Sequence, residues 1–156
     1  PRSTLFPYTT LFRSNVVEDI VRSVYRQGFK RLLILNGHGG NVAAYYRINE
    51  LVNELKDLKL AWYSWWQSSE VRSFADGHNL KMYHANWSEA FPFVRCTAVP
   101  RSEKQPLETN RILTDEQARE YYGDGVLGGV YQVDDALMNE TFSIALKDVL
   151  RLIEVI

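Results

Sequence analysis

The sequence predicts an α/β fold in three layers, with a mostly parallel β-sheet flanked by helices. Residues 32–35 form a short apolar run that ends at Asn36 and Gly37, which is typical of a strand buried on both faces, and this strand is expected over residues 29–35. Helical and strand patterns then alternate through short links, which favours βαβ units and a right-handed parallel sheet. A length of 156 residues suits one domain with a sizeable core.

The elements of the first half follow in order. Asn15 is expected to cap a helix, with Glu18 completing a capping-box-like start, and Gly28 is expected to end it. After the first strand, the spacing of apolar residues predicts a helix over residues 41–56. A second strand is predicted over residues 58–65.

The second half contains more irregular chain. Around the short helix expected within residues 68–83 the chain is polar. A helix is predicted to begin near residues 86–88 and to run to residue 94, although it contains Pro92. Thr114 is expected to cap a further short helix, with Gln117 at the capping-box position. The remaining expectations are a surface loop over residues 100–111, a glycine-rich turn over 123–129 and a final amphipathic helix over 134–156.

Composition excludes several classes of partner. The formal net charge is -1, so nothing indicates a nucleic acid or an anionic membrane as partner. No apolar run approaches the roughly 20 residues of a membrane span. The single cysteine, Cys96, cannot form an internal disulfide, which fits a cytoplasmic location, and it is expected to be a buried thiol.

The first informative stretch is L-N-G-H-G-G-N, which ends at Asn41. His38 is predicted at the carboxyl edge of a strand, where ligands bind in open α/β sheets, and the glycines on either side expose its imidazole. This pattern favours a metal-binding or catalytic role over a tight turn that His38 merely caps. A phosphate-binding loop is weaker, because no G-K-[ST] follows and the spacing is not G-x-G-x-x-G.

Two further features bear on a site. Trp65 and Trp66 fall at the expected end of the second strand, pointing opposite ways, and core packing and an aromatic pocket wall are about equally supported. The stretch H-A-N-W-S-E places His84 just before the predicted helix and Glu89 in its first turns. An imidazole and a carboxylate at a helix start suit metal binding or proton transfer, although a capping histidine and a dipole-favoured glutamate would also explain them.

The first 14 residues differ from the rest of the chain. T-L-F-P-Y-T-T-L-F-R-S, which ends at Ser14, reads like an in-frame translation of a common short-read sequencing adapter. We therefore interpret residues 1–14 as a non-native segment and residues 15–156 as the domain. The alternative is a natural flexible tail.

The two stretches together resemble the creatininase (creatinine amidohydrolase) family, whose motifs read N-G-H-G-G-N and H-A-G-x-x-E-T-S. Here the second motif stands as H-A-N-W-S-E-A-F. The tryptophan near residue 65 and the late G-V-L-G-G segment also match the family's order. The resemblance implies a hydrolase with a binuclear zinc or manganese centre that acts on a non-peptide C–N bond of a small molecule, a cyclic amide or a formamide. It also implies a homo-oligomer, a hexamer in the family.

Carried over residue by residue, the resemblance assigns His38 as a metal ligand and Glu89 as a metal ligand or metal-adjacent base. His84 corresponds to the catalytic histidine that moves a proton to or from the scissile group. The expected substrate pocket comprises Gly39, Gly40, Asn41, Trp65 and Trp87.

The departures from the family lead to a further expectation. The family places a glutamate, a histidine and an aspartate of its metal centre in a segment that should precede Asn15. We therefore expect a fragment that lacks the first strand or strands of the sheet and is inactive. Residues 86, 90 and 91 differ from the family's Gly, Thr and Ser, which leaves the substrate open.

Other functions remain open from the residues alone. One is a nucleotide-binding α/β module with its glycine-rich loop at residues 37–41. Another is a ring-opening hydrolase of a cyclic polyol ketone. The last is a non-catalytic fragment with only oligomer-forming surfaces.

Overall fold

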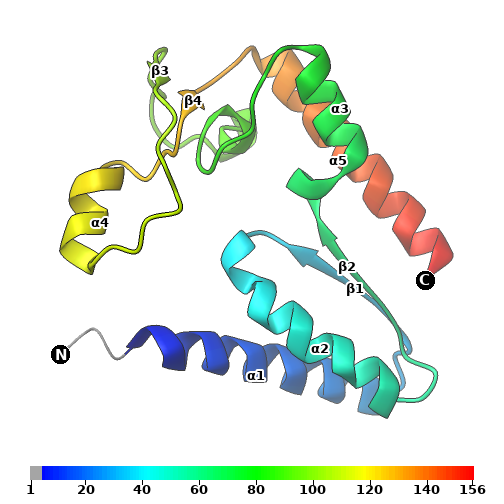
Figure 1. The fold of residues 1–156 in the computed structure, drawn as a ribbon. Coiled ribbons are helices and arrows are strands. Elements are labelled where there is room, and N and C mark those ends of the chain that lie inside the picture. The colour runs from blue at the N-terminus through cyan, green and yellow to red at the C-terminus, as the bar shows by residue number, and fades with distance from the viewer. Residues whose placement is uncertain (1–4) are drawn as a thin grey trace. The chain divides into compact units, whose positions relative to one another are not determined.

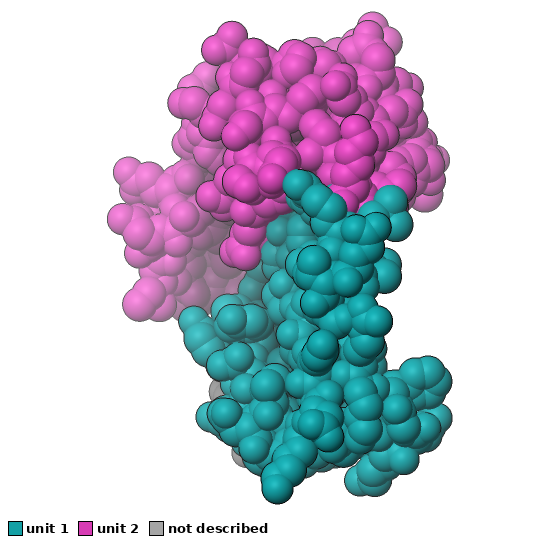
Figure 2. Space-filling model, turned by 90° about the vertical axis from the view of Figure 1, so that its right-hand side faces the viewer, with its two compact units in different colours: residues 1–65, 148–156 teal, residues 66–147 magenta. Residues whose placement is uncertain are grey.

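A computed structural model describes residues 5–156 of the chain, with side chains from residue 11 onwards. The chain divides into two compact units (Figure 2). Unit 1 comprises the chain up to Trp65 together with Asp148–Ile156, and unit 2 comprises Trp66–Lys147. None of the helices in the described part of the chain has the length and apolar character that a membrane span requires.

Unit 1 contains the predicted β-α-β arrangement. Strand β1 (Arg31–Asn36) and strand β2 (Lys59–Ser64) pair in parallel and are joined through helix α2 (Val42–Glu54). Helix α1 (Leu5–Arg26) lies beside α2, and both flank the strand pair (Figure 1). The predicted parallel pairing and α/β class are therefore confirmed for these elements.

The core of unit 1 lies between the helices and one face of the strands. Alternate strand residues point to this face, as expected for a pleated strand. The buried members of the cluster are Val21, Ile48, Leu51 and Leu58, and the strand residues packed against them are Leu32, Ile34, Leu60 and Trp62.

The prediction that the first strand is buried on both faces is wrong. Leu35, near the end of β1, is 61% exposed, and Phe29 is 60% exposed. The reason is that α1 and α2 cover one face only. On the other face the Tyr63 hydroxyl donates to Asp148 Oδ2 at 3.1 Å, which ties the end of helix α5 (Asp135–Val155) to β2.

The predicted helix start at Asn15 is also wrong, because α1 already begins at Leu5. Glu18 does not reach back to cap Asn15. Its carboxylate accepts from Arg22 Nε at 2.8 Å and from Arg47 Nε at 2.5 Å, so a contact with α2 replaces the local capping box. Within this longer helix Ser14 is buried at 6% exposure.

Unit 2 is built around short elements. Helix α3 (Ser69–Gly77) is capped by Ser68, and helix α4 (Asp115–Tyr122) has the capping box of Thr114 and Gln117 that the sequence predicts. Strand β3 (Glu103–Lys104) pairs antiparallel with strand β4 (Gly129–Val130). The buried cluster of unit 2 consists of Ala75, Trp87 and Met138.

The helix predicted between residues 86 and 94 does not form. Two 3₁₀ turns stand in its place, η3 (Trp87–Glu89) and η4 (Pro92–Val94). Pro92 disfavours a helical conformation at the residue before it, and Phe91 is accordingly extended at φ −57° and ψ 140°.

Two smaller expectations also change. Trp65 and Trp66 do not continue β2 but lie in a 3₁₀ turn, η2 (Trp65–Gln67), so they do not alternate as strand residues would. The Cys96 thiol is exposed rather than buried.

Candidate functional site

His38 caps the 3₁₀ turn η1 (Gly39–Asn41), which leads directly from the end of β1 into α2. Its backbone is extended, and its Nδ1 accepts a hydrogen bond from the Gly40 N–H at 2.9 Å. The His38 side chain is exposed at the carboxyl end of a parallel strand, as predicted. The hydrogen bond from Gly40 therefore fixes the orientation of the imidazole at the carboxyl end of β1.

Asn36, which the sequence analysis did not identify, supports the His38 loop through hydrogen bonds. Asn36 Oδ1 accepts from the His38 N–H at 3.2 Å and from Asn41 Nδ2 at 3.1 Å. Its Nδ2 donates to Ser64 Oγ at 3.0 Å, and Ser64 is the register partner of Asn36 on β2. Asn36 and Ser64 are both buried. The available signal was a lone amide at the end of an apolar strand, because a buried amide needs hydrogen-bond partners.

These bonds define the protonation of His38. Because Nδ1 accepts a hydrogen bond from the Gly40 N–H, the neutral ring carries its own proton on Nε2. The N–H groups of His38, Gly40 and Asn41 are all engaged within the loop. A phosphate-binding loop uses such amides for its ligand, so the bonding in this loop disfavours the nucleotide hypothesis.

Gly40 is required by this geometry. A Cβ at position 40 would lie 2.9 Å from His38 Nδ1 and 3.2 Å from His38 Cε1. Any larger residue would therefore displace the imidazole from this position. This close approach gives Gly40, predicted as a pocket residue, a definite role beside His38.

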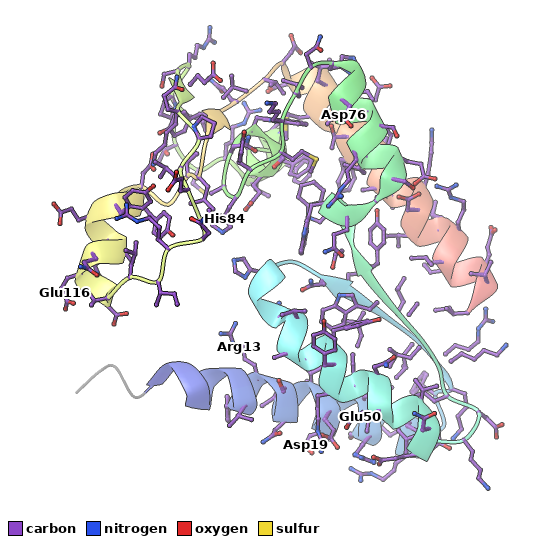
Figure 3. The ribbon with its side chains drawn as sticks, in the orientation of Figure 1. Arg13, Asp19, Glu50, Asp76, His84 and Glu116 are labelled. Carbon is purple, nitrogen blue, oxygen red and sulfur yellow. The ribbon has the colours of Figure 1, made fainter. Side chains whose placement is uncertain are left out.

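His84 has a different environment in unit 2 (Figure 3). Its Nδ1 lies 3.1 Å from the carbonyl oxygen of Gly125, and its own carbonyl accepts from the Leu127 N–H at 3.1 Å. A carbonyl can only accept, so Nδ1 carries the proton and Nε2 of the neutral ring carries the lone pair. A lone pair on Nε2 is what a proton-accepting histidine needs.

Glu89 belongs to the same loop as His84. Its Oε1 accepts from the Ala85 N–H at 2.8 Å. Ala85 has φ +59°, a left-handed conformation that costs an alanine about 1 kcal/mol or more. The Glu89 carboxylate thus stabilises a strained turn directly after His84, and both side chains are exposed.

Asn86 and Trp87 anchor this loop in the core. Asn86 Nδ2 and Trp87 Nε1 both donate to the Lys81 carbonyl, at 2.9 Å and 3.0 Å. Asn86 Oδ1 accepts from the Ser88 N–H and hydroxyl. Trp87, predicted to line the substrate pocket, is 0% exposed, so its indole supports the loop from within and offers no surface to a ligand.

The other predicted pocket residues all lie in unit 1. Gly39 and Gly40 are exposed in η1, Asn41 is half-buried beside them, and Trp65 is half-buried in η2. A pocket of about 700 Å³ lies elsewhere, in unit 2, where Arg101, Glu103 and Asp135 are among its lining residues. No candidate site residue lines that pocket.

The described residues do not assemble a metal site. His38 belongs to unit 1, whereas His84 and Glu89 belong to unit 2. Among residues 5–156, no three histidine, cysteine, aspartate or glutamate side chains gather so that they could hold a metal ion. The donor set described here therefore does not fit a metal on its own.

A second glycine-rich segment, residues 123–129 (hereafter the glycine-rich loop), contains an unusually acidic carboxyl group. Asp124 accepts hydrogen bonds from Lys104 Nζ and from the Tyr131 hydroxyl, both at 2.6 Å. The bond from Lys104, followed by that from Tyr131, lowers the pKa of Asp124 to about 2. The same bond to Asp124 raises the pKa of Tyr131.

These observations define an α/β protein with two exposed histidine loops, one of which ends a parallel strand. The family model for creatininase, described as creatinine amidohydrolase, matches residues 7–153, and the chain therefore belongs to the creatininase family. Members of this family are metal-dependent amidohydrolases. No curated protein and no solved structure matches the chain significantly.

Proposed function

We propose that this chain is part of a metal-dependent hydrolase that uses water to cleave a non-peptide C–N bond in a cyclic amide or formamide. The observation that carries the proposal is the family match over residues 7–153, which includes both histidine loops. The substrate is a small molecule, and the working protein is a cytoplasmic homo-oligomer, a hexamer in the family. Neither a nucleic acid nor a membrane takes part.

His84 is the proposed proton carrier. Its hydrogen bond to the Gly125 carbonyl leaves the lone pair on Nε2, which can accept a proton during attack on the scissile carbon. The same nitrogen then returns a proton to the nitrogen that leaves when the C–N bond breaks. Glu89 supports this role by holding the Ala85 turn, which follows His84 directly.

We propose that zinc or manganese binding needs protein ligands beyond His38 and Glu89. Catalytic zinc sites usually have three protein ligands, and no such group exists among the described residues. The chain as it stands is then inactive. In the proposed three-layer fold, β1 and β2 belong to a larger sheet with further strands.

The test is metal content by elemental analysis. We compare this chain with a version in which residues 1–14 are replaced by the upstream segment of the parent gene. The longer version is expected to bind about two zinc or manganese ions per chain, as in binuclear hydrolases, whereas this chain binds none tightly.

A matched pair of variants identifies the ligand. His38→Ala should abolish binding in the longer version. His78→Ala should not, because the His78 ring bonds to the Phe74 carbonyl at the end of α3 and is not part of either histidine loop. A longer version that binds no metal would refute the hydrolase proposal, and nucleotides would be tested next.

A further inference from the structure

We propose that Asp124 is a positioning residue for His84, because it anchors the glycine-rich loop whose Gly125 carbonyl fixes the imidazole. The consequence for catalysis rests on the proposed function of His84. The positioning itself is a property of unit 2 and can be tested without a substrate or a metal.

Asp124 joins three parts of unit 2. Its Oδ1 accepts from Lys104 Nζ on β3 at 2.6 Å and from the Val126 N–H at 3.1 Å. Its Oδ2 accepts from the hydroxyl of Tyr131, directly after β4, at 2.6 Å. Lys104 Nζ also donates to the Tyr122 carbonyl at the end of α4, at 2.9 Å. The Asp124 carboxylate therefore ties β3 and the residue after β4 to the loop, and Lys104 connects both to the end of α4.

The backbone of this loop is costly to order. Gly123 and Gly125, on either side of Asp124, adopt φ +62° and φ +83°. Glycines reach such angles easily, but they also lose the most conformational freedom on ordering. Around Asp124 the backbone bonds of the loop run from the Gly123 N–H to the Arg119 carbonyl at 3.0 Å and from the Gly125 N–H to the Tyr122 carbonyl at 3.2 Å. The carboxylate of Asp124 adds three hydrogen bonds to these.

The ordered loop contacts His84 at two points. The Gly125 carbonyl accepts from the ring at Nδ1, and the Leu127 N–H donates to the His84 carbonyl. Asp124 precedes Gly125 directly, so loss of the bonds to its carboxylate releases the backbone that carries this carbonyl. Without the acceptor at Nδ1, the neutral ring no longer favours the form with its proton on Nδ1, and the Nε2 lone pair is lost from part of the population.

The experiment is NMR of imidazole ¹⁵N shifts in the full chain, which distinguish the two neutral forms of each histidine. Spectra are recorded at about pH 8, above the ordinary histidine pKa. His84 in the parent chain should carry its proton on Nδ1. In Asp124→Ala, the ratio of the Nδ1–H to the Nε2–H form should fall about fivefold, the change expected from loss of one hydrogen bond.

His78 provides an internal control. Its Nδ1 also faces a carbonyl, that of Phe74 at 2.9 Å, but this bond lies within α3 and does not involve the glycine-rich loop. Its shifts should stay unchanged in the variant. Asp115→Ala, in the first turn of α4, removes another acidic residue of unit 2 and should alter neither histidine.

A second variant covers the case in which Asp124→Ala does not fold. Tyr131→Phe removes only the bond to Asp124 Oδ2 and should shift His84 in the same direction by a smaller factor. A folded Asp124→Ala with an unchanged His84 ratio would overturn the proposal, as would equal changes at His78 and His84. These outcomes do not depend on metal or activity, so failure of the hydrolase proposal would be seen separately.

Discussion

The two histidine loops differ in how their rings are held. The His38 ring accepts a hydrogen bond from Gly40, two residues away, and the bonds that support the loop come from the ends of β1 and β2. The His84 ring instead donates to Gly125, a residue 41 positions further along the chain. The two neutral rings therefore carry their protons on opposite nitrogens.

The His38 loop is therefore held mainly by contacts close to it in the chain, whereas the His84 loop is also held by residues distant in sequence. The His38 loop follows from one motif and one strand pair, because Asn36 and Ser64 face each other in the parallel register. The His84 loop depends on the packing of Asn86 and Trp87, on the glycine-rich loop and on β4. Changes in the second half of the chain should therefore disturb His84 and spare His38.

The largest expected effect concerns Gly129 on β4. A Cβ at this position would lie 2.9 Å from Asn86 Nδ2 and 3.1 Å from Tyr83 Cδ2, and Gly129 adopts φ +75°. We expect Gly129→Ala to lower the free energy of unfolding by about 2–4 kcal/mol, because it combines a clash with a strained backbone. Denaturant unfolding would measure the loss.

The matched control for Gly129→Ala is Gly77→Ala, at the end of α3. A Cβ there meets nothing within 4 Å, and Gly77 has no positive φ. Because Gly77 is the last residue of a helix, this change should cost nothing and should raise the free energy of unfolding by at most about 1 kcal/mol. Equal losses in the two variants would show that the close contact between β4 and Asn86 does not support the His84 loop.

The same contrast explains how much of the fold could be predicted. The parallel pairing of β1 with β2 and the cap of α4 depend on residues close in sequence, and both were predicted correctly. Patterns of period and capping carry this information directly. The start of α1 was not predicted, because residues 1–14 were interpreted as a segment outside the domain, whereas α1 begins at Leu5. The bond of Glu18 to Arg47 on another helix was also missed, because no local rule reports it.

The candidate site shows the same division. The place of His38 at a strand end was predicted from its motif, whereas Asn36 was missed because one of its partners, Ser64, lies on the neighbouring strand 28 residues away. The helix expected after His84 was replaced by 3₁₀ turns, since Pro92 interrupts it. The link from His84 to Gly125 spans too much chain for any pattern to reveal it. Whether the two loops share one metal centre stays a prediction.

The second-largest expected effect is that of Asn36→Ala on the His38 loop. It removes the acceptor for the His38 N–H and the donor to the buried Ser64 hydroxyl, so we expect a loss of about 2 kcal/mol in the free energy of unfolding. Hydrogen exchange at the His38 amide should speed up as well. Asn53→Ala, an exposed position on α2, is the control and should change little. Unchanged exchange at His38 in Asn36→Ala would contradict the assigned support.

Glu18 gives the contact between α1 and α2 in unit 1 a pH dependence. Its bond to Arg22, together with that to Arg47, holds the pKa of Glu18 below its usual value. A lowered folded-state pKa contributes stability above the unfolded-state value of about 4.3, and this contribution is lost as the pH falls through the folded-state pKa. Glu18→Gln should therefore flatten the acid side of the stability curve. Asp19→Asn, an exposed neighbour on α1, should leave that curve as steep as before.

The smallest expected effect lies at Ala85, where strain and chain entropy oppose each other. Ala85→Gly removes the cost of a left-handed alanine but adds freedom to the unfolded chain, so the free energy of unfolding should rise by only about 0.5 kcal/mol. Ala136→Gly, in the first turn of α5, should instead lower it by about 0.5–1 kcal/mol, because that alanine is helical. Opposite signs in denaturant unfolding would confirm that the turn after His84 is strained. A loss in Ala85→Gly equal to that in Ala136→Gly would mean that Glu89 holds no strained turn.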